Sequence, residues 1–331
     1  MSTPKPTTAS PSDTAPANPF APSAFERRQE RRARRNQRIM FLFCMLLVVP
    51  VLAILVDIFV KAAPVLSLDY LWHNPEAKGK EGGLWAPLAG TFYLVIGSLS
   101  VVAPVGILGA IYLNEYAQDG WFKRIISIAV TTLAGVPSIV IALFGLGAFV
   151  LGLLPAINHF VADPARPETK WQGGLLTASL TIAVMTLPVI ITAAREALGA
   201  VPQSFREACW NLGATRWQTI RTIVLPNSFG GILTGVILEI CRAAGETAPI
   251  LFTGATFFKF VADEGWEKVF PYPPGEPFMA MSMHLHVISS QISQMPDNMK
   301  FGCAAVLIAL ILSVNSSAIA LRVWLRARKR W

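Results

Sequence analysis

Three ionisable side chains stand within one apolar stretch, ILEICRAAGETAPILF. They are Glu239, Arg242 and Glu246, and spacings of three and four residues place them on one face of a helix. A charged group inside a membrane costs at least about 2.5 kcal/mol, so such groups are rare unless they pair or line a pathway. Two interpretations stay open: a self-neutralising ladder that only holds helices together, and one wall of an ion path.

If the face lines a path, its chemistry favours an anion. Gly245 and Pro249 bracket Glu246 and can break the helix there, and a break frees backbone N–H groups that suit a negative charge. The forked guanidinium of Arg242 matches a tetrahedral oxyanion. The predicted path residues are Glu239, Arg242, Glu246, Thr247 and Ser138.

The elements that must position these residues are membrane helices. Of the 331 residues, 53% are hydrophobic and only 15% charged, whereas soluble domains carry about 25% charged residues. A helix needs roughly 20 apolar residues to cross a bilayer, and continuous apolar runs favour helices. We expect an all-α integral membrane protein with six transmembrane helices, at about 39–60, 91–113, 125–151, 175–194, 230–252 and 302–321.

Basic residues flank the apolar runs and predict the topology. Seven arginines lie in Glu26–Arg38, and five of the last ten residues are Arg or Lys, so both termini are expected in the cytoplasm. The loop at about 195–228 then also lies inside. The expected organisation is a disordered basic segment 1–38, a first transmembrane helix 39–60, an external loop 61–86, a transmembrane domain 87–321 containing a cytoplasmic loop 201–226, and a basic tail 322–331.

Other chemistries find little support. Both basic patches abut apolar runs and no nucleic-acid-reading module accompanies them, so nucleic acid is not an expected partner. His284 and His286 lack an evident third metal ligand and are interpreted as polar loop residues. No metal or disulfide site is predicted for the cysteines, which lack the required spacing: Cys44, Cys209, Cys241 and Cys303.

The loop 201–226, VPQSFREACWNLGATRWQTIRTIVLP, is too polar to span and carries helix signals. Pro202 suits the first turn of a short helix over 203–212, and Gly213 suits the left-handed residue that ends one. A second short helix is predicted from Thr215 to about Leu225. From these residues alone the loop is either an amphipathic segment lying on the lipid surface or a compact knob for docking a protein.

The order of residues in this loop resembles the EAA loop of ABC importer permeases. That loop has Glu-Ala-Ala, then Gly at the seventh position and Ile-x-Leu-Pro at its end; Cys209 stands here in place of the second Ala. The resemblance implies that the first helix sits in a cleft of an ATPase subunit and transmits its closure. The residues assigned to this coupling are Arg206, Glu207, Ala208, Gly213, Ile223, Leu225 and Pro226.

Longer stretches resemble the PstA-type permeases of phosphate ABC importers, members of the binding-protein-dependent type I importer family with a MetI-like bundle. They are RAAGETAPILFT, GTFYLVIGSL, PVGILGAIYLNEY and LAGVPSIVIALFGLGAFV, within about Pro87 to Thr253. Sulfate and molybdate permeases typically show Gly-Glu-Phe-Gly instead of Gly-Glu-Thr-Ala-Pro. Two positions depart from the pattern: Thr192 stands where many members have Arg, with Arg195 the nearest arginine, and Glu239 replaces an apolar residue.

The resemblance implies a permease subunit in the plasma (inner) membrane that imports phosphate by alternating access. Its expected partners are a homologous permease subunit of the PstC type, two ATPase subunits, an external phosphate-binding protein and membrane lipid. The chain has no Gly-x-x-x-x-Gly-Lys-Ser/Thr loop and no catalytic constellation, so ATP and Mg are expected on the ATPase and no cofactor on this chain. The alternatives are a sulfate or molybdate permease and a non-transporting sensor or assembly subunit.

Overall fold

The computed structural model describes residues 24–162, 166, 169–262 and 264–328, and it divides into two units, residues 1–57 and 58–331. The prediction of an all-α protein with six spans is confirmed. The helices of the described residues that are long and apolar enough to cross a bilayer are Arg32–Ala62, Trp85–Tyr116, Ser138–Val161, Leu175–Gly199, Arg216–Gly245 and Asp297–Trp324.

Helix α1 (Ala24–Ala62) contributes all the described residues of the first unit. Residues 24–38 are helical, in contrast to the disorder predicted for residues 1–38; residues 1–23 lie outside the described part of the chain. The reason is local, because this segment is rich in Arg, Glu, Gln and Ala, which are strong helix formers. The apolar run that follows continues the same helix, and its large side chains are exposed within the unit.

The third span begins later than the predicted range of 125–151. Gly135 ends one helix and Pro137 precedes the next, since proline cannot continue a helix and disfavours helical geometry in the residue before it. The apolar run is thus two helices, only the second of which leads across. The elements in order are α4 (Trp121–Ala134), α5 (Ser138–Gly145), the π-helical segment η3 (Leu146–Leu153) and α6 (Leu154–Val161).

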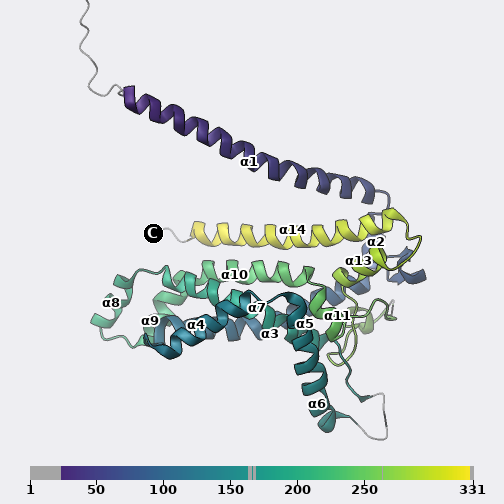
Figure 1. Ribbon diagram of the computed structural model, residues 1–331. Coiled ribbons are helices and arrows are strands. Elements are labelled where there is room, and N and C mark those ends of the chain that lie inside the picture. The colour runs from purple at the N-terminus through teal and green to yellow at the C-terminus, as the bar shows by residue number, and fades with distance from the viewer. Residues whose placement is uncertain (1–23, 163–165, 167–168, 263, 329–331) are drawn as a thin grey trace, which may run out of the picture. The chain divides into compact units, whose positions relative to one another are not determined.

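Three long helices form the centre of the second unit: α3 (Trp85–Ile111), α7 (Leu175–Gly199) and α10 (Leu225–Gly245). Helix α7 packs against both of the others, and α14 (Asp297–Arg328) packs along α10 (Figure 1). Small residues allow this approach. A Cβ atom added at Gly106 would lie 2.7 Å from Ile190 Cγ2, and one at Gly235 would lie 2.4 Å from the Cβ of Ala193.

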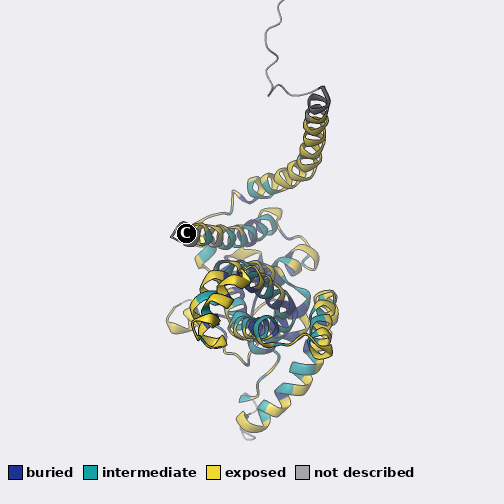
Figure 2. Cartoon of the chain, turned by 90° about the vertical axis from the view of Figure 1, so that its left-hand side faces the viewer, coloured by how far each residue is buried: buried dark blue, intermediate teal, exposed yellow. Residues whose placement is uncertain are grey.

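Burial in the second unit follows this arrangement. Buried residues gather at its centre, whereas the outward faces of its peripheral helices are exposed (Figure 2). Many of the exposed side chains are apolar, including Phe144 on α5 and Phe160 on α6. An outward apolar face is what a helix needs when hydrocarbon rather than water surrounds it.

The segment between α10 and α14 packs over one end of the three central helices. Its backbone and side chains bond to them: the Tyr272 hydroxyl donates to the Ala86 carbonyl at 3.0 Å, and the Met281 N–H donates to Thr91 Oγ1 at 2.9 Å. This segment is therefore a packed layer, and it includes α11 (Ala248–Thr253), α12 (Trp266–Val269) and α13 (Met281–Ser290).

A small hairpin joins the same layer. Strands β1 (Pro75–Glu76) and β2 (Glu81–Gly82) pair antiparallel around the 3-10 turn η1 (Ala77–Gly79), just after the short helix α2 (Leu68–Trp72). In Figure 1, α2 and α13 lie at the end of the unit opposite to helices α8 and α9, whose bounds are given with the site.

His284 differs from its interpretation as a polar loop residue, because it lies in α13 and is only 2% exposed. Its ring stacks on Phe257 with 5.2 Å between ring centroids, and its Nδ1 has no hydrogen-bond partner in the described structure. Burial lowers the pKa of His284 to about 4, because an apolar environment disfavours the charged ring.

We expect the free energy of unfolding to fall as the pH drops from about 6.5 to 4. In this range the unfolded chain binds a proton at His284 whereas the folded chain does not, and the full effect is about 3 kcal/mol. Chemical unfolding of the purified protein in detergent at a series of pH values measures it. His284→Gln should flatten the slope and His286→Gln, at an exposed position of the same helix, should keep it; equal slopes in both variants contradict the argument.

Candidate functional site

The loop between α7 and α10 begins with a short helix, α8 (Gln203–Asn211), as the sequence predicts. It starts directly after Pro202, and Gly213 follows its end with a φ of +81°, in the left-handed region. The Gly213 N–H donates to the Trp210 carbonyl at 2.9 Å. The predicted conformation of Gly213 is therefore confirmed. Glycine is favoured here because of the positive φ. Space does not require it, since no heavy atom lies within 4 Å of the position that a Cβ would take.

The second predicted short helix is not separate from the fifth span. Thr215 caps α9 (Arg216–Thr219), with its hydroxyl accepting from the Gln218 N–H at 3.3 Å. The chain then continues through the π-helical segment η5 (Ile220–Val224) into α10. Pro226 lies in the first turn of α10, where proline is tolerated, so it opens the next helix without separating it from the preceding one.

The predicted coupling residues divide by exposure. Those that face solvent in the described structure are Glu207, Ala208, Gly213 and Pro226. Ile223 and Leu225 are half-buried, whereas Arg206 is buried. A partner protein can therefore reach most of this set, but Arg206 is turned toward the bundle.

Arg206 joins α8 to the ends of two central helices. Its guanidinium donates to both carboxylate oxygens of Glu115, from Nη2 at 2.8 Å and from Nε at 3.2 Å. Glu115 lies in the π-helical segment η2 (Tyr112–Tyr116), which extends α3. The same guanidinium donates to the carbonyls of Val201 at 2.6 Å and Leu198 at 2.9 Å, at the end of α7.

This ion pair is almost fully enclosed, with side-chain exposures of 7% for Arg206 and 8% for Glu115. Asn114 Nδ2 donates to Glu115 Oε1 at 2.7 Å, so the carboxylate has a further donor. A displacement of α8 must therefore move α3 and α7 or break a buried ion pair. The sequence did not single out Glu115. The pattern that could have identified it is an acidic residue at the cytoplasmic end of one predicted span and several arginines in the loop that follows another span.

An apolar surface covers the exposed side of the loop. A pocket there is lined by Phe205, Ala208, Cys209, Ile223 and Asn227. Phe205 is 51% exposed and Leu212 is 88% exposed. Exposed apolar patches of this kind mark surfaces that bind proteins or membranes.

At the other end of the fifth span the predicted helix break is present. Helix α10 ends at Gly245, Glu246 is extended with φ −74° and ψ 132°, and α11 begins at Ala248. Arg242 Nε donates to Glu246 Oε1 at 3.2 Å. The arginine side chain is 45% exposed, so its charge is accessible beside the break.

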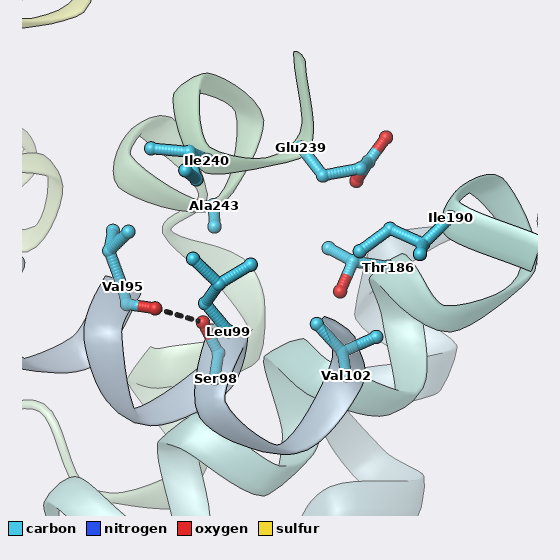
Figure 3. Close-up of a pocket in the computed structure, with 9 residues that line it drawn as sticks. All are labelled: Val95, Ser98, Leu99, Val102, Thr186, Ile190, Glu239, Ile240 and Ala243. Carbon is cyan, nitrogen blue, oxygen red and sulfur yellow. Dashed lines mark hydrogen bonds between the residues drawn. The ribbon is translucent and has the colours of Figure 1, made fainter. Parts of the chain in front are cut away.

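Glu239 does not join this pair. It is 5% exposed, lines a small cavity between α3, α7 and α10, and its Oε2 has no hydrogen-bond partner within the described chain (Figure 3). The three charged residues of the span therefore do not form one bonded ladder. Arg242 and Glu246 form a pair at the break, and Glu239 is buried separately.

The remaining predicted path residues lie at two helix starts. Ser138 begins α5 after the break at Pro137, and Thr247 precedes α11. Helices α5 and α11 pack against each other. The break at Glu246 is tied to the packed layer, because Ser282 Oγ donates to the Glu246 carbonyl at 2.9 Å.

The structure also shows what the two positions in span four do. The Thr192 hydroxyl donates to the Pro188 carbonyl of its own helix at 2.8 Å. Arg195 Nη1 donates to Ser127 Oγ of α4 at 3.3 Å. Arg195 is thus engaged with α4, and Arg242 remains the arginine beside the break.

Comparisons with known proteins agree with this architecture. The family described as binding-protein-dependent transport system inner membrane component matches residues 103–331. The chain is 34% identical over 227 residues to the phosphate transport system permease protein PstA of Mycobacterium leprae, covering 67% of this chain and 69% of that protein. It is 30% identical over 293 residues to PstA 2 of Mycobacterium bovis, covering 87% and 86%.

A solved structure shares the fold. It is a chain of a bacterial alginate ABC transporter, in complex with a periplasmic protein that binds an alginate pentasaccharide. The TM-score is 0.54 at 14% identity, covering 87% of this chain and 97% of that one. At this identity the likeness concerns the fold alone.

We expect Glu115→Gln to destabilise the protein by about 3–5 kcal/mol, because it leaves the Arg206 charge buried without its counter-charge. Chemical unfolding in detergent measures the loss. The matched control is Asp119→Asn, which removes the acid of the exposed pair with Lys123 (2.9 Å apart) and should change nothing measurable. A Glu115→Gln loss under about 1 kcal/mol would mean that the pair behaves as a surface pair.

Proposed function

Because this chain belongs to the family of binding-protein-dependent transport system inner membrane components, and so is a multi-pass membrane subunit of an ABC importer, we propose that its cargo is inorganic phosphate. Relatives named as phosphate transport permeases match most of the chain. The observation that carries the proposal in the structure is the pair of Arg242 and Glu246 at the break of the fifth span.

The chemistry of this pair suits a tetrahedral oxyanion. The guanidinium of Arg242 offers two parallel donors, and the carboxylate of Glu246 occupies one of them. A phosphate arriving at the break would replace Glu246 as the partner of Arg242. The hydroxyls of Ser138 and Thr247, at the starts of α5 and α11, are the further contacts in this proposal.

The loop with α8 is the docking site for an ATPase subunit in this proposal. Both termini and this loop lie in the cytoplasm, as the basic flanks predict. Glu207, Ala208 and the apolar pocket around Phe205 are exposed and form the contact surface. ATP and Mg bind the ATPase, not this chain.

The Arg206–Glu115 ion pair supplies the mechanical link of the proposed cycle. Closure of two ATPase subunits pushes α8, and the ion pair passes the displacement to α3 and α7. These helices pack on α10, so the break near Arg242 changes its access from one side to the other. A second, homologous permease of the PstC type completes the path, and an external phosphate-binding protein delivers the anion.

Two other functions make different predictions. A sulfate or molybdate permease would have the same docking loop, and the alginate transporter shows that the fold itself does not specify cargo. A sensor or assembly subunit would bind the ATPase but pass no anion. Deleting the chain and measuring uptake of phosphate, sulfate and molybdate distinguishes a phosphate permease from a sulfate or molybdate permease. Loss of sulfate uptake alone would refute the phosphate proposal.

We expect Arg242→Gln to lower phosphate uptake by about 10- to 100-fold, because the charge-assisted bonds to the anion are lost. ATPase co-purification should be unchanged, since Arg242 lies in the last turn of α10, whereas α8 precedes the start of that span. Lys80→Gln, which removes an exposed charge near the hairpin, is the control and should leave uptake intact. Normal uptake by the Arg242 variant would refute an anion path at this residue.

We expect Gly213→Val to weaken ATPase co-purification or to uncouple ATP hydrolysis from uptake. A β-branched side chain cannot hold the φ of +81° without strain, so the end of α8 must rearrange. The control is Gly230→Ala, where φ lies outside the left-handed region and no atom lies within 4 Å of an added Cβ. Coupled transport and full assembly in the Gly213 variant would contradict the docking role.

A further inference from the structure

The cavity beside Glu239 is lined by both polar and apolar side chains. Its polar lining consists of the Glu239 carboxyl from α10 and the hydroxyls of Ser98 on α3 and Thr186 on α7 (Figure 3). The other lining residues are apolar: Val95, Leu99, Val102, Ile190, Ile240 and Ala243. The space is enough for about one water molecule.

The hydroxyl hydrogens in the cavity are already used. Ser98 Oγ donates to the Val95 carbonyl at 3.0 Å, the bond drawn in Figure 3, and Thr186 Oγ1 donates to the Ile182 carbonyl at 3.0 Å. Each hydroxyl can therefore only accept a further hydrogen bond. An ionised Glu239 also only accepts, so these hydroxyls offer it no hydrogen, and Glu239 Oε2 is without a hydrogen-bond partner in the described structure.

No cation in the described structure bonds to the Glu239 carboxyl. Arg242, three residues further on, bonds to Glu246 instead. Helix α10 also packs against α3, α7, α13, α14 and η5, but only α3 and α7 line the cavity with it, and neither contributes an ionisable side chain to the lining. A buried carboxylate without a donor or a cation is costly, and a proton is the smallest group that removes its charge.

We propose that this cavity is a proton-binding site, in which Glu239 carries a proton and is neutral while the helices are packed. When α10 separates from α3 and α7, water enters, the O–H bond of the acid breaks, and the proton passes to water while the electron pair stays on the carboxylate. Repacking of the helices takes a proton back. Proton uptake and release then accompany helix movement, whatever the cargo.

Infrared spectroscopy of the full-length complex in membranes tests the proton directly. A protonated carboxylic acid has a C=O stretch that a carboxylate lacks and that shifts in D₂O. We expect such a band at neutral pH in the wild type and in Glu81→Gln, which alters an exposed carboxyl, and its loss in Glu239→Gln. Identical acid bands in the wild type and Glu239→Gln would overturn the proposal.

A second measurement separates a proton from a metal cation as the group bound beside Glu239. If Glu239→Gln removes no acid band but abolishes a stabilising effect of Na⁺ relative to choline, the site binds a metal cation and the proton proposal is wrong.

The link to the transport cycle has its own readout. ATP hydrolysis by the reconstituted complex should decline at alkaline pH in the wild type, because repacking then lacks a proton, and should decline less in Glu239→Gln, which is permanently neutral. Parallel pH profiles of the two proteins would overturn the coupling to helix movement. Since this assay needs no phosphate, its result is independent of the proposed cargo.

Discussion

A polar group in the interior of a bilayer has no water to bond, so each must find a partner within the protein or border a cavity. The spans of this chain follow that constraint closely. Thr181 and Thr192 donate their hydroxyls to carbonyls of their own helix. The Thr253 carbonyl, at the end of α11, accepts from Thr177 Oγ1 of α7 at 2.6 Å. At the break of the fifth span Ser282 supplies a partner for the Glu246 carbonyl. Buried atoms of Ser179, Glu239 and Arg322 have no partner in the described part of the chain, and of these three residues Glu239 is the one that lines a cavity.

The same helices connect two regions that sequence arguments treat separately. Helix α8 bonds through Arg206 to the extension of α3 and to the end of α7. Further along, α3 and α7 enclose Glu239 against α10. The break at Glu246 follows two turns later on α10, where the packed layer holds it through Ser282. Helices are stiff over this length, so a displacement of one end of α3 or α7 also moves the other end.

What could be predicted depends on whether the signal was local. The apolar runs predicted the six spans. Gly213 and Gly245 predicted helix ends, because the residues next to a helix end determine where it stops. The helix over 24–38 was missed because this segment was grouped with the Ser-, Thr- and Pro-rich residues before it, although its own residues favour a helix. Glu115 and the burial of His284 were missed because they depend on partners far away in the chain. The helical spacing of Glu239 and Arg242 was visible, but their different environments depend on which neighbours pack against each.

Arg206 has one more consequence, for the last turn of α7. The carbonyls at a helix C-terminus carry the negative end of the helix dipole, and a buried cation there stabilises the helix by up to about 2 kcal/mol. Arg206 bonds the Leu198 carbonyl within the last turn of α7 and the Val201 carbonyl just beyond it, so it acts as a C-terminal cap supplied by the following helix. The terminal turn of α7 and helix α8 therefore stabilise each other and should fray or order as one cooperative segment. For the proposed docking role, the loop thereby keeps a defined shape before a partner arrives, and less conformational entropy would be lost on binding.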